Sequence, residues 1–280
     1  MLIQWFPGHM AKARRLVQEN LKLVDVVIEL VDARIPASSR NPMILEIIEN
    51  KPSVMALNKA DLADPNVTAA WIANFKQNGL SAVAIESIGG KGTKELVSAT
   101  QNAAKPKMDA IVARGRRERA VRAMIIGIPN VGKSSLINRL AGTGNVKTGD
   151  RPGVTKGKQW IKVGKDFELL DTPGILWPKF EDPEIGFKLA ATGAISDDVI
   201  DIEKITLHLI GLLRNTHRQG LLERYKLEEL PDSNEDVLAL IGKKRGFLQA
   251  GGAIDINKSA RTVLLEFRAG KLGRITLDNL

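Results

Sequence analysis

The chain has 280 residues, of which 44% are hydrophobic and 26% charged, and it contains no cysteine. This length suggests two domains, and the lack of cysteine excludes disulfides, thiolate metal ligands and a thiol nucleophile. No apolar stretch approaches the roughly 18 residues of a membrane helix, and residues 1–10 lack a signal-peptide pattern. We therefore expect a cytoplasmic protein with no membrane partner. The net charge of +9 fits either a polyanionic partner such as RNA or a solubility charge spread over the surface.

Six short apolar runs rich in Val, Ile and Leu predict buried strands of a mainly parallel sheet. Helical patterns lie between many of them. Asn41 and Pro42 suit the N-cap and first residue of one helix, and another helix is expected to begin at Ser134. Alternating strands and helices predict an α/β doubly wound domain. The six expected strands lie at residues 24–31, 53–57, 82–85, 123–126, 159–163 and 167–170.

Two later regions differ from this pattern. Residues 105–122 carry seven Lys or Arg against two acids, which indicates a connector or a basic helix between two halves of the sheet. After about residue 183 strand patterns end, and Ser233 with Asp236 predicts a capping box in which Asp replaces Glu. We expect a nucleotide-binding domain over residues 1–180 and a smaller all-helical domain over 181–280. The helices expected in the second domain lie at residues 201–213, 234–243 and 258–267.

The sequence GIPNVGKS at residues 127–134 matches the P-loop pattern, between a predicted strand and a predicted helix. Such a turn brings backbone N–H groups close to phosphate oxygens at a helix N-terminus, whose dipole favours anions. Lys133 can neutralise the β- and γ-phosphates during catalysis, and Ser134 can place its hydroxyl on Mg²⁺. The strand-turn-helix context disfavours the alternative of a chance glycine turn. Further nucleotide contacts are expected from Asn130, Val131, Gly132 and Ser135.

Asp171-Thr-Pro-Gly174 follows the last predicted strand. A carboxylate at the C-terminal end of a strand facing a P-loop suits a water-mediated partner of Mg²⁺, and the Gly174 N–H can sense the γ-phosphate. Alone, this tetrapeptide could be only a turn; after a P-loop it indicates a nucleotide switch. Thr155, in GDRPGVT at residues 149–155, is the candidate switch threonine for Mg²⁺, and its local sequence fits better than that of Thr148.

Asn58-Lys-Ala-Asp61 follows another predicted strand and indicates selection of guanine. The Asp61 carboxylate can accept hydrogen bonds from the N1–H and 2-amino groups of guanine, a donor pair that adenine lacks. Asn58 can support the other edge of the base, and the Lys59 stem can cover its face. A plain helix start is the weaker alternative beside the other two motifs. The remaining base-site residues expected are Ala60, Glu86 and Ser87.

Together these motifs resemble the YlqF/RbgA family of circularly permuted GTPases, which assist assembly of the large ribosomal subunit. The resemblance covers nearly the whole chain and extends to WFPGHM at residues 5–10 and DARIPASSRNP at residues 32–42. It implies a P-loop GTPase fold, GTP or GDP as the nucleotide, Mg²⁺, and the large ribosomal subunit with its rRNA as partner. Residues 86–88 depart from the Ser-Ala-Lys form usual in GTPases.

The order of the motifs is permuted, since NKAD at residues 58–61 precedes the P-loop at residues 127–134. The sheet can still form, because strands that are neighbours in space need not be neighbours in sequence. Residues 175–183 lead directly from the switch into the helical region. We therefore expect loss of the γ-phosphate to reorient that region.

Ile175 follows DTPG, where many GTPases carry a Gln that orients the attacking water, so intrinsic turnover is expected to be slow. His9 is the internal candidate for orienting that water. Chemistry alone favours a packing role for His9, whereas the resemblance implies a catalytic one; His208 and His217 have no such claim. Asn130 resembles the residue with which some GTPases bind K⁺ in place of an arginine finger, the alternative being a turn-stabilising Asn.

The helical region is rich in basic residues. Each of them singly fits a solvated helix face better, but together with the basic residues 105–122 they favour phosphate contacts with a structured RNA. The function expected is a monomeric GTP-hydrolysing switch for late assembly of the large subunit, slow unless a ribosomal particle activates it. The alternatives are a GTPase in another RNA process, such as RNA modification, and a GTP-sensing module with negligible hydrolysis. The basic residues are Lys243, Lys244, Arg245, Lys258, Arg261, Arg268, Lys271 and Arg274.

Overall fold

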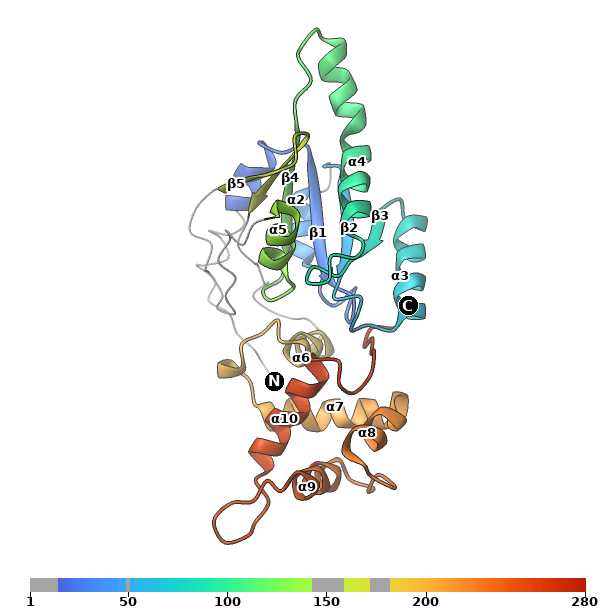
Figure 1. The fold of residues 1–280 in the computed structure, drawn as a ribbon, viewed down its shortest axis with the longest axis vertical. Coiled ribbons are helices and arrows are strands. Elements are labelled where there is room, and N and C mark those ends of the chain that lie inside the picture. The colour runs from blue at the N-terminus through green and yellow to red at the C-terminus, as the bar shows by residue number, and fades with distance from the viewer. Residues whose placement is uncertain (1–14, 49–50, 143–158, 172–181) are drawn as a thin grey trace.

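The computed structural model describes residues 15–48, 51–142, 159–171 and 182–280. Its six strands form one sheet in the order β3-β2-β1-β4-β6-β5 (Figure 1). Neighbouring strands are parallel except β5 and β6, which pair antiparallel. The strands are β1 (Val26–Asp32), β2 (Ser53–Asn58), β3 (Ser81–Ala84), β4 (Val121–Gly127), β5 (Gln159–Val163) and β6 (Phe167–Asp171).

Helices cover both faces of the sheet, because its central strands are apolar on both sides. Along β1, Ile28 and Leu30 belong to the cluster that contains residues of α4 and α5. Val27 and Val31 lie on the opposite face, which packs against residues 15–21, α2 and α3. The predicted doubly wound α/β domain is thus confirmed. These helices are α2 (Pro42–Ile48), α3 (Pro65–Gln77), α4 (Thr93–Ala113) and α5 (Lys133–Ala141).

All six predicted strands are present, with their ends shifted by at most two residues. Two predicted helix starts are also confirmed. The Asn41 side chain accepts the Met43 N–H at 3.1 Å, and the Ser233 hydroxyl accepts the Asp236 N–H at 3.0 Å.

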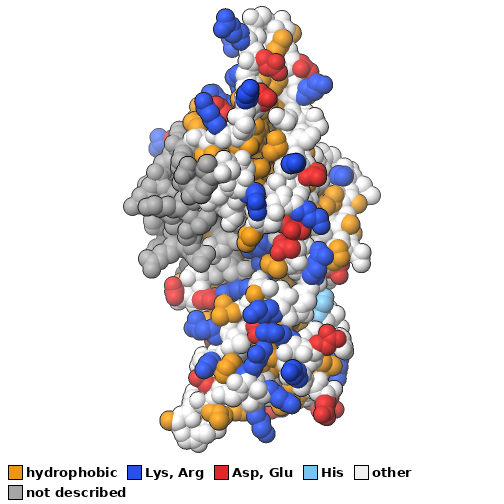
Figure 2. Space-filling model, viewed as in Figure 1, with side chains coloured by type: hydrophobic (Ala, Val, Ile, Leu, Met, Phe, Trp, Pro, Cys, Tyr) orange, Lys and Arg blue, Asp and Glu red, His pale blue; other side chains and the backbone are white. Residues whose placement is uncertain are grey.

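The basic stretch at residues 105–122 is divided among three elements. Helix α4 continues to Ala113, residues 114–120 form a loop that opens with a turn, and β4 begins at Val121. The helix extends this far because its buried stripe continues through Ala104 to Met108. Figure 1 shows α4 reaching beyond the sheet, away from the helical part of the molecule. On the face seen in Figure 2, Lys and Arg side chains occur near this tip and over the helical part, interspersed with Asp and Glu.

After β6 the regular elements of the described chain are all helices, apart from an isolated bridge between Leu248 and Ile254. The sequence patterns missed α6 and α8. Asp182 caps α6 by accepting the Glu184 N–H at 2.8 Å, with Pro183 as the first helical residue. The elements are α6 (Pro183–Thr192), the 3₁₀ helix η1 (Asp197–Val199), α7 (Ile202–Thr216), α8 (Arg218–Tyr225), α9 (Asn234–Arg245) and α10 (Ile256–Arg268).

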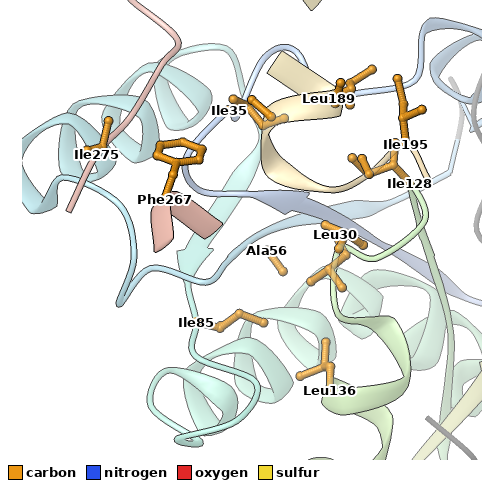
Figure 3. Packing of buried hydrophobic residues seen from close by; sticks show 14 of the residues in the cluster. Leu30, Ile35, Ala56, Ile85, Ile128, Leu136, Leu189, Ile195, Phe267 and Ile275 are labelled. Carbon is orange, nitrogen blue, oxygen red and sulfur yellow. The ribbon is translucent and has the colours of Figure 1, made fainter. Parts of the chain in front are cut away.

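A single hydrophobic cluster continues from the sheet into the helical part. Figure 3 shows Ile35 and Ile128, from the loops after β1 and β4, near Leu189 and Ile195 from α6 and the residues after it. The domain boundary predicted at residue 180 lies between β6 and α6, yet the residues on either side of it share this core. No helix in the described ranges is long and apolar enough to cross a membrane.

Candidate nucleotide-binding site

The candidate site lies where three adjacent strands end. Strand β1 ends at Asp32, β2 at Asn58 and β4 at Gly127. These strands are parallel neighbours, so their carboxyl ends meet at one edge of the sheet, where α/β proteins bind ligands. That edge faces α6 and α10 in Figure 1.

The P-loop is packed so closely that a side chain on either of two of its glycines would clash with neighbouring atoms. A Cβ on Gly127 would lie 2.5 Å from the Leu30 carbonyl oxygen. Gly132 has φ of +102°, and its Cβ would lie 2.3 Å from the Asn58 amide nitrogen. The first turn of α5, which includes the half-buried Ser134 and Ser135, follows without a side-chain cap on its N-terminus. Uncapped N–H groups at a helix N-terminus suit an anion.

The Lys133 ammonium group lies within the curve of the P-loop. Its Nζ donates to the carbonyls of Gly127 at 2.9 Å and Ile128 at 2.7 Å. The side chain is largely buried. A positive charge is therefore held at the start of α5, beside the uncapped N–H groups.

Asn58 joins three loops of the site. Its Nδ2 donates to the Val131 carbonyl at 2.7 Å, and its Oδ1 accepts the Ser87 N–H at 3.0 Å and the Ser87 hydroxyl at 2.8 Å. Both side chains are buried. Asn58 and Ser87, which the sequence placed at the base, thus also attach the NKAD turn to the P-loop and to the turn after β3.

Lys59 adopts φ of +59° and lies between the P-loop and a buried carboxylate. Its Nζ is 2.8 Å from the Asn130 carbonyl oxygen and 3.0 Å from Asp32 Oδ2. Burial lowers the pKa of Lys59, which the nearby Asp32 opposes. Burial alone would raise the pKa of Asp32, but Arg34 and Lys59 hold it below its usual range. The Asp32 carboxylate is therefore ionised at neutral pH.

The remaining base-site residues differ in exposure. Asp61 is exposed at the end of the NKAD turn, whereas the Ala60 carbonyl accepts Arg274 Nη2 at 2.7 Å. Glu86 begins the turn after β3, and its carboxylate is 3.8 Å from Lys91 Nζ. Of the predicted base-site residues in this turn, Asp61 is therefore the one exposed to solvent.

Asn130 connects the P-loop to the helical part. Its backbone has φ of +55°, and its Nδ2 donates to the Gly193 carbonyl at 2.8 Å. This contact between residues 63 positions apart was not predicted. Another residue that the prediction missed is Arg34, which pairs with Asp32; its only signal was its place in DARIP at residues 32–36.

Several predicted residues, or their side chains, lie outside the described part of the chain. Asp171 ends β6, whose Leu170 pairs with Met124 of β4; the Asp171 side chain is not described. Among the described side chains, no group of three or more His, Asp or Glu could hold a metal ion. The predicted Mg²⁺ ligand Thr155 and the Asp171 side chain lie outside this set. The other predicted residues outside the described ranges are His9, Thr148, Gly174 and Ile175.

The chain is similar to proteins of ribosome assembly. Residues 122–243 match the model of the "50S ribosome-binding GTPase" family. Over 99% of this chain and 94% of the relative, it is 55% identical to ribosome biogenesis GTPase A of Bacillus cereus. It is 36% identical to mitochondrial ribosome-associated GTPase 1 of Mus musculus, over 98% of this chain and 90% of that one. GDP-bound YlqF superposes with a TM-score of 0.69 at 26% identity, covering 95% of this chain and 99% of the other.

The fold, the P-loop and the earlier NKAD turn on one sheet edge define a class: a P-loop GTPase with its motifs in circularly permuted order. The full-length similarity is more specific than the class. The chain belongs to the ribosome biogenesis GTPase A (RbgA/YlqF) family. It is a GTP-hydrolysing enzyme of ribosome assembly, and the predicted family is confirmed.

Proposed function

We propose that the chain is a Mg²⁺-dependent GTP switch that acts on a late precursor of the large ribosomal subunit, with slow hydrolysis that the particle accelerates. The observation that carries this proposal is the Asn58 side chain. It binds Val131 of the P-loop and Ser87 in one network, so the phosphate-binding and base-binding elements form one rigid site beside the exposed Asp61.

The residues at the sheet edge fit the chemistry of GTP and Mg²⁺. The α5 N-terminus and Lys133 supply positive potential for the phosphates. Ser134, Thr155 and, through a water, Asp171 would supply the oxygen ligands that Mg²⁺ prefers. Bound Mg²⁺ would neutralise charge on the β- and γ-phosphates, and the Gly174 N–H would sense the γ-phosphate.

Two further residues are assigned to hydrolysis. His9 would orient the attacking water in place of the missing Gln. Asn130 would offer its side-chain oxygen to K⁺, since the hydrogen bond to Gly193 uses only the amide nitrogen. Because Asn130 adopts a left-handed conformation, it also fits the alternative role of stabilising the turn.

The ribosomal partner is proposed from the names of the relatives and from the positive charge of the chain. The bacterial relatives are named for ribosome biogenesis, and the chain carries a net charge of +9. Exposed Arg114, Arg116 and Arg117 beyond α4, and exposed lysines at the end of α9, would bind rRNA phosphates. We propose a monomer that works in the cytoplasm, with residues 181–280 as the principal RNA-binding part.

The test is GTP hydrolysis with and without purified large subunits. We expect stimulation by at least about tenfold, because positioning of water by a partner contributes factors of this order or more. His9→Ala should still bind GTP but lose the stimulation, whereas the control His208→Ala, whose ring pairs with Glu184 at 3.0 Å, should keep it. Equal rates with and without particles would argue for another RNA process or a GTP sensor. Equal stimulation of both variants would remove His9 from the mechanism.

A further inference from the structure

Helix α6 ends against the nucleotide site, and side chains from distant segments bind its last carbonyls. A helix leaves four C-terminal carbonyls without partners inside the helix, and that end attracts positive charge. Here three side chains donate to the carbonyls of successive residues. Arg268 donates to Ala190 at 2.9 Å and to Ala191 at 3.1 Å, Arg34 donates to Thr192 at 3.2 Å, and Asn130 donates to Gly193 at 2.8 Å.

Arg34 is buried, with 1% of its surface exposed, and it pairs with Asp32 through two hydrogen bonds. Its Nε is 2.9 Å from Oδ1 and its Nη2 is 2.7 Å from Oδ2. The guanidinium carbon also lies 5.8 Å from the centre of the Phe267 ring. Arg34 thus binds a sheet carboxylate and a helix carbonyl with the same planar group.

The same carboxylate holds the lysine of the guanine-recognition motif. Lys59 Nζ is 3.0 Å from Asp32 Oδ2 and donates to the Asn130 carbonyl. Asn130 in turn reaches α6 through Gly193. Asp32 and Arg34 therefore lie at the junction of the NKAD turn, the P-loop and α6.

The ion pair at this junction is buried, with 2% of the Arg34 side chain and 3% of the Asp32 side chain exposed. Nearby, Ile35, Ile128, Leu189 and Ile195, each at most 1% exposed, pack between the sheet loops and α6 (Figure 3). Water does not screen charged hydrogen bonds in such a place, and an unpaired carboxylate there is costly. An arginine suits the position because its planar group can bind a carboxylate and a carbonyl at once, which a lysine cannot do with the same geometry.

We propose that Arg34 is a positioning residue of the nucleotide site, which through Asp32 sets Lys59 against the P-loop and through Thr192 fixes the end of α6 where Asn130 meets it. Arg34 would act through Asp32 and Thr192, not through a contact of its own with the nucleotide. The inference rests on the nucleotide site proposed above. The Asn130–Gly193 hydrogen bond also joins the helical part to the P-loop directly, independently of the chain connection through residues 175–183.

A matched control lies at the opposite end of β1. Asp25, just before the strand, is buried and pairs with Arg119 through bonds of 2.8 and 2.9 Å, and with Lys107 at 2.7 Å. This arrangement repeats the pairing of Asp32 with Arg34 and Lys59, but at the edge of the sheet away from the site. Arg119→Gln therefore breaks a similar ion pair without touching the P-loop, the NKAD turn or α6.

The experiment compares Arg34→Gln and Arg119→Gln by melting temperature, by Kd for a fluorescent GDP, and by kcat and KM for GTP. We expect Arg34→Gln to weaken GDP binding about tenfold, as for loss of one strong interaction, and to raise KM while kcat changes by less than about twofold. Arg119→Gln should lower the melting temperature yet keep Kd within about twofold. A purely structural role would reduce the active fraction, which lowers kcat and leaves KM unchanged.

If Arg34→Gln does not fold, the GDP affinities of Arg34→Lys and Arg119→Lys are compared instead. The first should weaken GDP binding about threefold and the second should not. Wild-type affinity in a folded Arg34 variant, or equal losses of affinity in the Arg34 and Arg119 variants, would overturn the proposal. Failure of the wild-type protein to bind GDP would instead overturn the proposed nucleotide site.

Discussion

Asp61 is the exposed member of the NKAD turn, the predicted site of base recognition, whose other residues are held in place. Asn58 is fixed by the P-loop and Ser87, Lys59 by Asp32, and the Ala60 carbonyl by Arg274. A carboxylate on such a rigid turn selects a base through two charge-assisted hydrogen bonds. Selection of guanine should therefore depend on this side chain alone.

Asp61→Asn tests that assignment. The amide cannot accept both hydrogen bonds from guanine, so GDP affinity should fall by about 3 kcal/mol or roughly a hundredfold. Xanthosine diphosphate, which carries a carbonyl oxygen in place of the 2-amino group, should bind the variant better than GDP does. Competition binding with both nucleotides measures the change, and Asp232→Asn, at another exposed position, is the control. An unchanged preference for GDP would place the base elsewhere.

At the scale of elements, β1 has a buried aspartate at each end, and the two contact different parts of the molecule. Asp32 lies at the nucleotide site, whereas Asp25 binds Arg119, Lys107 and the Arg122 N–H. Asp25 therefore attaches the end of α4 and the following turn to the sheet. This contact explains how a basic stretch can extend beyond the sheet and still return to β4 (Figure 1).

Asp25→Asn should destabilise the fold in a way that depends on pH. Burial alone would raise the pKa of Asp25, but its hydrogen bonds to Arg119 and Lys107 hold it below its usual range. A lowered carboxyl pKa stabilises the fold above the ordinary value of about 3.9, and the effect fades as pH falls below that value. We expect a loss of about 2–3 kcal/mol at pH 7 and a smaller one at pH 3, measured by urea unfolding. The control is Asp109→Asn, which changes an exposed carboxylate on α4. An equal loss of stability at both pH values in Asp25→Asn would contradict this account.

At the scale of the whole molecule, the C-terminal segment returns to the sheet and holds the two parts together. The N–H groups of Ile275 and Leu277 donate to the carbonyls of Leu62 at 3.0 Å and Arg34 at 2.7 Å. Asp278, 3% exposed, accepts from the Ser38 N–H and hydroxyl and from Lys188 on α6. Because one hydrophobic cluster also runs through both parts, we expect them to unfold together.

Asp278→Ala should lower the free energy of unfolding by about 3 kcal/mol, since it leaves Lys188 and the Ser38 donors without their buried acceptor. Denaturant unfolding followed by circular dichroism measures the loss. Glu229→Ala removes an exposed carboxylate and should change stability by less than about 0.5 kcal/mol. Similar stability of the two variants would show that the C-terminal segment does not hold the parts together.

The sequence patterns predicted the strands well and the helices less evenly. Each central strand is a continuous apolar run, a local signal that packing on both faces requires. Helix α8 (Arg218–Tyr225) has only eight residues and includes Gly220, so its pattern is short and weak. Helix α6 carries Gly186 and a mostly apolar surface because it is buried against the sheet loops and α7, and a helix that is apolar all round lacks the amphipathic period.

By itself the sequence determined the class of protein, because the P-loop and the NKAD turn are contiguous motifs, each formed by neighbours along the chain, and their permuted order can be read directly. The tertiary structure alone decided how these motifs are joined. Asn58 binds a loop 73 residues away, and Arg34 binds a helix end 158 residues away. Such pairs leave no periodic trace in one sequence, because they depend on which strand ends lie side by side and which helix packs against them.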